Sequence, residues 1–457
     1  PTLIDATSGT VTYTFPVPAD AAPNQQFNDT ITLTDAANNV GTFGVTISTA
    51  PEGPGPGSGR IEIEQALVIA CQSAPAGSDL AATCAALPAE GTAERAAADS
   101  QVKPDELAAQ GTMAIEAADG QSQLVGSRLS ALRAGSSGLS LSGLNLNLFG
   151  QHVPGFVLDS MLPRVGQSGD QSGISTKFGF FVNGNVRIGD KDPSANEPGF
   201  DFDAYDATMG LDYRFTPNFV FGGALGYGTA ETDFQNDAGD TELDGYKLSF
   251  YGTYYTSQAV YVDGIFTFGM NSYDTRRRIT FTGVNEDAMG DTDGTEISLS
   301  VGGGYDFTRD GFVFGPYGRA SYLQLDIDGY RETLTGNTGL ALQLDDQEAT
   351  SITATVGGKA IYNISTTIGV LSPQLNVEYE YEFDDDQRAI TGVFVSDPTA
   401  TQWGFGIDEP DRDVINVGVG GSATLKNGTS GFLFYEQLLG HDDISQFTVT
   451  GGFRFEF

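Results

Sequence analysis

Few residues in this sequence have the type and spacing that catalysis requires, and the histidines are the first to consider. His152 and His441 are the only two. The segment GHDDIS places His441 beside Asp442 and Asp443, and a histidine next to carboxylates can support acid–base chemistry of the kind used by a protease at the rim of a barrel. No G-x-S-x-G elbow, Cys-His pair or phosphate-binding loop accompanies this short cluster. We therefore interpret it as a solvated loop and predict that the chain is not an enzyme.

Two acidic segments raise the question of a metal. ETDFQNDAGDTELD (231–244) and NEDAMGDTDGTE (285–296) contain no Lys or Arg. Asp291, Asp293 and Glu296 could offer oxygen ligands to calcium, although the complete EF-hand spacing is missing. Two alternatives remain open, namely divalent cations that bridge these segments to lipopolysaccharide phosphates, and a plain hydrated anionic surface. The last is favoured, so no cofactor is expected and calcium is the one candidate.

The two cysteines, Cys71 and Cys84, lie within CQSAPAGSDLAATC. Without a second pair or a histidine cluster they do not match a zinc site. We predict a structural disulfide formed in an oxidising compartment. A redox role is disfavoured because the C-x-x-C arrangement is absent.

Length and charge limit the possible classes of protein. At 457 residues the chain is long enough for at least two regions. Its 60 acidic and 22 basic residues give a formal charge of −38, which argues against a nucleic-acid partner. No run approaches the ~20 apolar residues of a membrane helix, but this does not exclude a membrane β-barrel. The opening PTLIDATSG lacks Met and a signal peptide, which predicts a processed form or a piece of a longer protein.

The first part of the chain divides by composition. Residues 1–50 alternate Thr with apolar residues and are typical of the C-terminal part of an Ig-like repeat of the kind found in long surface adhesins, although they are short for a complete sandwich. Residues 51–59 (PEGPGPGSG) are a Pro/Gly linker. Residues 60–135 are Ala-rich and predict a helical segment that contains the disulfide. Residues 136–177 form a connector, and from 178 to 457 the pattern changes to repeated strands.

Residues 178–457 predict an antiparallel barrel. Period-2 runs such as YKLSFYGTYY recur about twelve times, with one apolar face and one wet face. Five short connections, among them 216–218 and 256–258, alternate with long polar ones, among them 231–243 and 272–294. This asymmetry is typical of an up-and-down barrel whose ends face different compartments. A soluble sandwich or propeller is the alternative, but either would bury the wet face.

The predicted fold class is therefore mainly β: about twelve antiparallel strands in a transmembrane β-barrel, preceded by an α-helical segment and a short Ig-like β segment. The last predicted strand ends GGFRFEF. Phe453, Phe455 and Phe457 alternate with Arg454 and Glu456, so the phenylalanines are expected to face lipid and the charged residues the lumen.

This final strand, the preceding FLFYEQLLG and the strand count resemble the autotransporter (type V secretion) barrel of Gram-negative bacteria. The resemblance implies an outer-membrane anchor that, with the barrel assembly machinery, brings an N-terminal passenger to the cell surface. It also implies that Phe453, Phe455 and Phe457 belong to the signal which that machinery reads. Outer-membrane lipid and lipopolysaccharide would surround the barrel. The barrel would carry its own passenger, which is expected to be adhesin-like and to bind an unknown extracellular ligand.

Relatives run a segment through the pore, and two candidates exist here. One is the helix that ends LVGSRLSALRAG, and the other is the connector at 153–165. If the helix is the plug, Arg128 and Arg133 should approach lumen carboxylates such as Glu378, Glu380 or Asp263, because an isolated buried charge is costly. The alternative for the helix is an external stalk with solvated arginines.

Two further expectations concern the whole chain. Some relatives cleave their passenger at an Asn-Asn junction inside the pore. The only such pair here is Asn38-Asn39, far upstream, so the passenger is expected to stay attached. The alternative function is a porin-like outer-membrane channel with an N-terminal appendage.

Overall fold

The structure of the protein is a computed structural model that describes residues 61–133 and 178–455, apart from residues 105, 195, 236–237, 257–258, 385–386 and 426–428. It also gives the backbone of two hairpins, β1 (Gln26–Thr34) with β2 (Val40–Ser48), and β3 (Asn145–Leu148) with β4 (Gln151–Pro154). The predicted linker at 51–59, the Asn38-Asn39 pair, connector residues 155–165, Glu456 and Phe457 lie outside the described residues.

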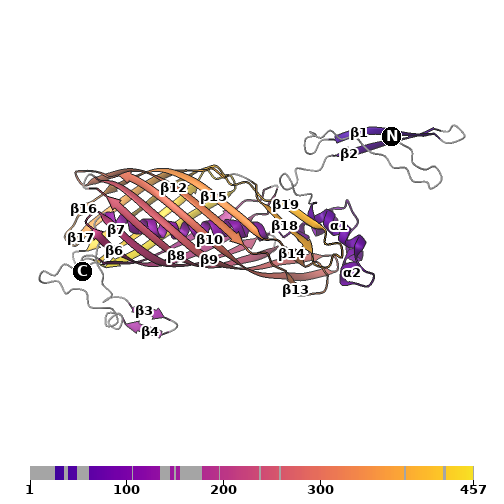
Figure 1. The fold of residues 1–457 in the computed structure, drawn as a ribbon, viewed down its shortest axis with the longest axis horizontal. Helices are drawn as coiled ribbons and strands as arrows, with labels where there is room; N and C mark the ends of the chain where they lie inside the picture. Colours follow the sequence, from indigo (N-terminus) through magenta and orange to yellow (C-terminus); the bar gives the residue numbers. More distant parts are fainter. Residues whose placement is uncertain are drawn as a thin grey trace.

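Twelve antiparallel strands form a closed barrel (Figure 1). In chain order they are β5 (Phe178–Lys191), β6 (Phe200–Thr216), β7 (Phe219–Phe234), β8 (Gly239–Tyr255), β9 (Val260–Phe281), β10 (Val284–Tyr305), β12 (Phe312–Ile327), β15 (Gln347–Tyr362), β17 (Gly369–Glu382), β20 (Asp413–Leu425), β21 (Thr429–Leu439) and β22 (Ile444–Phe455). The barrel closes where β22 pairs with β5, with Val449 opposite Val186. The predicted twelve-stranded barrel preceded by helices is confirmed.

Alternation along the strands explains why the barrel forms. On β8, Tyr246, Leu248 and Phe250 are 64%, 40% and 43% exposed on the outer face, while Lys247 and Ser249 point inward and are buried. Outward aromatic and aliphatic side chains recur around the barrel, and a band of this size is favourable only against lipid. Small β11 (Phe307–Arg309), β13 (Thr333–Leu334) and β16 (Ile364–Ser365) pair at the strand ends.

Two predicted long connections prove to be largely strand. β9 and β10 continue through most of 272–294 and meet in a tight turn at Gly283, whose φ is +84°. Likewise, most of 231–243 belongs to β7 and β8. The prediction of loops was wrong because the alternation continues there with its polarity reversed. Carboxylates now face outward, and apolar residues such as Leu243 and Tyr273 are buried inside.

Four helices precede the barrel: α1 (Ile63–Ser73), α2 (Asp79–Ala86), α3 (Ala93–Val102) and α4 (Glu106–Arg133). Ser78 and Thr92 cap α2 and α3, accepting hydrogen bonds from the backbone N–H groups of Ala81 and Arg95. α4 runs inside the barrel, whereas α1 and α2 lie beyond one of its ends (Figure 1). No helix in the described part of the chain has the length and apolar character needed to cross a membrane.

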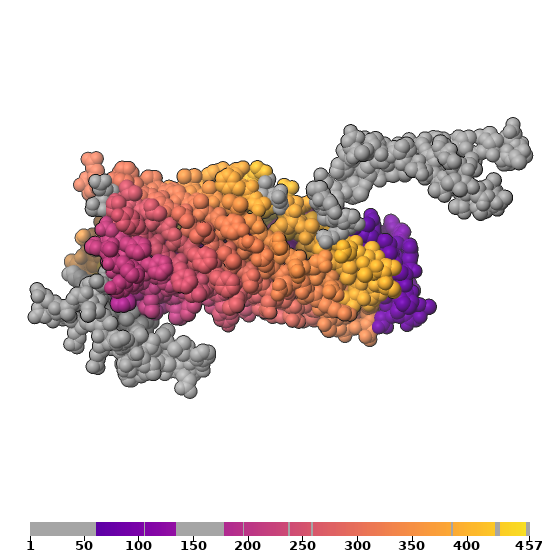
Figure 2. Space-filling view, in the orientation of Figure 1, coloured from indigo at the N-terminus to yellow at the C-terminus, as the bar shows by residue number. Residues whose placement is uncertain are grey.

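A compact cap covers this end of the barrel. It consists of α1–α3 and a three-stranded sheet of β14 (Leu342–Leu344), β18 (Ala389–Phe394) and β19 (Gln402–Gly406). Trp403, fully buried, lies in its core with residues from α1 and with Ile279 and Val284 of the barrel hairpin. Figure 2 shows the N-terminal helices in contact with these later segments. We call this the cap end, and the opposite end, where β16 and β17 turn, the turn end.

Candidate functional site in the barrel lumen

The α4 helix lies in the lumen and packs mainly on the wall formed by β6–β9. Gln121 donates through Nε2 to Ser249 Oγ on β8 at 2.8 Å, and its Oε1 accepts from the Thr208 hydroxyl on β6. Asn183 of β5 donates to the backbone oxygen of Leu124 at 3.0 Å. Of the two predicted arrangements of this helix, the structure has the luminal one and not the external stalk.

The strongest electrostatic contact between helix and wall is an ion pair between Arg128 and Asp212. Arg128 donates from Nε to Oδ2 at 2.7 Å and from Nη2 to Oδ1 at 3.1 Å, and the Tyr251 hydroxyl donates to the same carboxylate at 3.2 Å. The two charged side chains are only 2% and 3% exposed. This two-pronged geometry satisfies both charges, which offsets the cost of burying them.

The sequence predicted that Arg128 and Arg133 would approach lumen carboxylates, but it identified the partner of only one of them. Arg133 forms an ion pair with Asp263, and its guanidinium lies 3.8 Å from the Tyr261 ring centroid. Arg128, however, binds Asp212 and neither Glu378 nor Glu380. These lie on β17, on the wall away from the helix, where Arg319 of β12 pairs with them at 3.2 and 3.7 Å. The sequence analysis did not identify Asp212. The alternation in GLDYRF places it on the lumen-facing side of β6, and this could have marked it as a candidate partner.

The helix glycines distinguish tight from open parts of this contact. A Cβ added at Gly120 would collide with the Asp206 carboxylate and lie 2.8 Å from Arg187 Nη2, and one at Gly111 would collide with the Arg388 guanidinium. A Cβ at Gly126 would meet no atom within 4 Å. Gly120 is therefore needed for close approach to the wall, and Gly126 is not.

We expect Gly120→Ala to lower the free energy of unfolding by about 1–3 kcal/mol, because the added methyl group overpacks the contact. Gly126→Ala, the matched control, should be neutral or stabilise by up to ~1 kcal/mol through helix propensity. Urea unfolding of both variants in lipid vesicles measures the difference. Equal shifts in the two variants would contradict the packing that the structure shows.

The candidate calcium ligands do not converge. Asp291 and Asp293 point outward from β10, whereas Glu296 points inward, is 0% exposed and lies 3.5 Å from Lys247 Nζ. The strand conformation separates them because positions of opposite parity lie on opposite faces. Within the described ranges there is no group of three His, Cys, Asp or Glu residues arranged to hold a metal. The predicted set of these three residues is thus corrected: they do not form one site.

The outward carboxylates form a row across neighbouring strands. Asp203 is paired in register with Glu231, Glu231 with Glu242, Glu242 with Asp274, and Asp274 with Asp291. All five are exposed on the outer face towards the cap end, beyond the aromatic and aliphatic band. Like charges placed directly opposite one another destabilise a sheet unless cations or solvent compensate for them.

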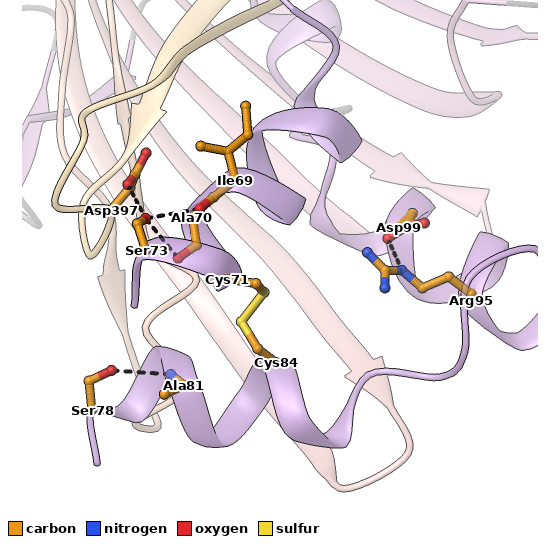
Figure 3. Close-up of a disulfide and its surroundings, with 10 residues drawn as sticks. All are labelled: Ile69, Ala70, Cys71, Ser73, Ser78, Ala81, Cys84, Arg95, Asp99 and Asp397. Carbon is orange, nitrogen blue, oxygen red and sulfur yellow. Dashed lines mark hydrogen bonds and ion pairs between the residues drawn. A yellow bond between two sulfur atoms is a disulfide. The ribbon is translucent and has the colours of Figure 1, made fainter. Parts of the chain in front are cut away.

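The cap contains the predicted disulfide. Cys71 of α1 is bonded to Cys84 of α2, with the two Cα atoms 5.6 Å apart (Figure 3). Beside it, Ser73 donates through Oγ to Asp397 Oδ1 at 3.0 Å, which joins α1 to the segment between β18 and β19. α1 buries Leu67 completely in the cap core, whereas α2 contributes mainly Leu80. The cross-link therefore attaches the less buried helix to the better buried one.

Asp397 makes cap stability sensitive to acid. Burial raises the pKa of its carboxyl, but donors from Thr399 and Thr401 outweigh this and lower the pKa to about 2. Because the folded value lies below the unfolded value of ~3.9, the ionised group stabilises the cap above about pH 4 by about 2 kcal/mol. This contribution is lost as pH falls from about 4 to 2.

We therefore expect the free energy of cap unfolding, followed by the fluorescence of Trp403, the single tryptophan, to fall over that pH interval. Asp397→Asn should be less stable at pH 7 and should show a smaller loss in acid. Parallel pH profiles for the variant and the parent protein would show that another group controls acid sensitivity.

The remaining candidate residues are His441, which lies in a turn, and the phenylalanines at the end of the chain. His441 Nδ1 lies 2.7 Å from Asp411 Oδ2 and accepts from the backbone N–H of Ile444 at 3.1 Å, in the turn between β21 and β22. Phe453 points outward on β22 and is 66% exposed. Phe455 continues that strand, and the terminal Phe457 lies outside the described residues.

Comparison with known proteins gives one family and several distant relatives. The autotransporter beta-domain family model matches residues 180–436. Esterase EstA of Pseudomonas aeruginosa is 28% identical over 221 residues, which cover 47% of this chain and 32% of that protein. Outer membrane protein B of Rickettsia typhi is 24% identical over 367 residues, or 78% of this chain and 20% of that protein. The chain thus spans a third or less of the length of these relatives.

A solved structure shares the fold. The translocator domain of autotransporter NalP from Neisseria meningitidis superposes with a TM-score of 0.51 at 15% sequence identity, covering 75% of this chain and 98% of that one. The family match covers more than half of this chain and includes most of the barrel strands.

Proposed function

Because the chain belongs to the autotransporter family through its β-domain, we propose that it translocates an N-terminal passenger and keeps it attached at the cell surface. Autotransporter β-domains reside in the outer membrane, and the domain itself is not enzymatic. The observation that carries the proposal is the path of the chain. It leaves the cap, crosses the whole barrel once as α4 and ends that crossing at the turn end, where β5 begins.

This path supports display because one end of α4 is held at each mouth of the barrel. Near the cap end, Thr241 donates to the backbone oxygen of Glu106 at 3.4 Å. Near the turn end, Arg133 binds Asp263, close to the start of β9. If the cap end faces outward, whatever precedes α1 is attached on the cell-surface side. A wide porin-like channel is less well supported, because α4 and the cap both occupy the path.

The test is surface labelling of residues 1–60 in intact cells. A single cysteine at Ser8, in a background in which Cys71 and Cys84 remain paired, should react with an impermeant maleimide before the cells are permeabilised. Labelling that needs permeabilisation would place the N-terminal region in the periplasm and would overturn display. An adhesin-like role for the passenger, with an unknown extracellular ligand, rests on the Thr-rich alternation of residues 1–50 and the β1–β2 hairpin.

We also propose lipopolysaccharide and the barrel assembly machinery as partners. The outer row of Asp203, Glu231, Glu242, Asp274 and Asp291 fits divalent cations that bridge to lipopolysaccharide phosphates. Removing divalent cations with EDTA should lower the melting temperature of the barrel in lipopolysaccharide-containing vesicles. Glu231→Gln/Glu242→Gln should reduce this shift, and an unchanged melting temperature on EDTA addition would reject the bridge.

The assembly signal is assigned to Phe453, Phe455 and Phe457 by family resemblance and by the outward position of Phe453. Deleting Phe457 should reduce the amount of folded barrel in the outer membrane. Full assembly after that deletion would remove Phe457 from the signal.

A further inference from the structure

The α4 helix has a water-accessible face although it lies inside the barrel. Asp119 and Ser130 are exposed, and other positions on the same face are half-buried. Their spacing of three and four residues places them along one side of a helix. The residues of this stripe are Thr112, Ile115, Glu116, Asp119, Ser122, Gln123, Gly126, Ser127, Ser130 and Arg133.

The opposite face of the same helix is sealed against the wall. Leu124, Val125, Leu129 and Leu132 are at most 1% exposed. The wall they meet is equally dry, since Lys247 and Arg187 have side chains only 1% and 3% exposed. The helix therefore divides the lumen unevenly, and its packed side, against β5–β9, is closed to bulk water.

The wall away from this packed side is wetter. Glu378, Glu380 and Arg319 have side chains 14%, 24% and 36% exposed, although all three lie on lumen-facing positions. The empty space around a Cβ built at Gly126 is consistent with a gap filled by water. The helix stripe reaches the far strands at Gln123, which donates to Glu436 of β21.

The length and the closed end of this gap follow from the helix. At 1.5 Å per residue the stripe from Thr112 to Arg133 extends about 30 Å, close to the thickness of the hydrocarbon core. Nearer the cap, the six residues from Glu106 to Gly111 are all buried, so the accessible stripe stops there. The cap core lies directly beyond.

We propose that a water-filled passage runs beside α4 from the turn end to Thr112, is closed by the cap, and admits small hydrated cations in preference to anions. Carboxyl groups of Asp119, Glu378, Glu380 and Glu436 border it, and the guanidinium of Arg319 is shared between two of them. Arg133 and Lys359 also lie near the turn end, but each is paired with a carboxylate, Asp263 and Asp306, so carboxylates outnumber cations along the passage. A narrow lumen with an excess of one sign of charge concentrates counter-ions. α4 is thus an incomplete plug, and the cap and not the helix makes the barrel tight.

Cysteine accessibility tests this directly, because both native cysteines are held in a disulfide and an introduced one is the only free thiol. Ser122→Cys and Ser130→Cys lie on the stripe, and Leu124→Cys and Leu132→Cys are controls at the same depth on the buried face. Each purified, folded barrel is treated with two methanethiosulfonates of similar size, one carrying a trimethylammonium group and one a sulfonate. Rates are normalised to those of the urea-unfolded protein.

We expect both stripe variants to react in the folded state and both controls to be protected. The normalised rate at Ser122→Cys should favour the cationic reagent by about tenfold. Adding Glu378→Gln and Glu380→Gln should reduce that preference. Protection of Ser122→Cys, or equal reactivity of Ser122→Cys and Leu124→Cys, would overturn the passage, and an anionic preference would overturn its cation selectivity. Surface labelling of the N-terminal region is independent of all these results.

Discussion

Arg128→Ala is expected to lower the free energy of unfolding of the barrel by about 3–5 kcal/mol. The loss is large because the substitution leaves the Asp212 carboxylate, 3% exposed, without its cation while Tyr251 alone still donates to it. Urea unfolding in phospholipid vesicles, followed by circular dichroism of the β-sheet, gives this free energy.

Two variants show whether the loss comes from burial of the pair. Arg309, the last residue of β11, has a side chain 90% exposed and pairs with the neighbouring Asp310. Arg309→Ala should change stability by less than about 0.5 kcal/mol. The double variant Arg128→Met/Asp212→Leu removes both charges and should recover much of the lost stability. A double variant no better than Arg128→Ala would mean that the alkyl packing of Arg128, and not its charge, holds the helix.

The barrel itself could be predicted because its strands obey a local rule. In YKLSFYGTYY the alternation of Leu248 and Phe250 with Lys247 and Ser249 reports which side faces lipid, and each strand carries that signal independently. Closure follows from an even number of strands whose ends meet. No long-range information was needed for either step.

The same alternation failed where its meaning changed. Between Asp274 and Asp291 the aspartates face outward, because here the interior is filled largely by apolar side chains of the helices and strands, among them Ile279 and Val284. The inward Arg277 and Glu286 of this stretch are buried. A polar segment in a barrel sequence resembles a loop unless one knows that the lumen is occupied. Whether the lumen is occupied depends on where α4 lies, and α4 precedes this stretch by some 150 residues in the chain.

Pairing partners in the lumen were likewise beyond the sequence. The choice of Asp212 over Glu378 for Arg128 depends on which wall the helix contacts. That contact is set by small residues such as Gly120, which allow the helix to approach β5 and β6 closely. Arg133 does pair with Asp263, one of the three carboxylates suggested for the two arginines, because both residues lie near the turn end of their elements. The cap could not be foreseen because its core joins α1 to Trp403, which is distant in the chain.

Removing the disulfide should affect the cap and spare the barrel. In Cys71→Ser/Cys84→Ser we expect the free energy of cap unfolding to fall by about 3 kcal/mol, since the unfolded state regains the loop entropy that the cross-link removed. Trp403 reports mainly on the cap, because it is the only tryptophan and is completely buried in the core where α1 and β19 meet the end of the β9–β10 hairpin. Its fluorescence transition should move to lower urea, while the β-sheet transition followed by circular dichroism should stay in place.

A reducing agent supplies the internal control. It should shift the Trp403 transition of the parent protein to the position found for the double serine variant, and should leave the variant itself unchanged. If the two transitions moved together, the cap and barrel would unfold as one unit, and the cap would not be a separate closure. If neither moved, α2 would be held by the packing of Leu80 without help from the cross-link. Either result would remove the basis for treating the cap as a disulfide-stabilised seal over the passage beside α4.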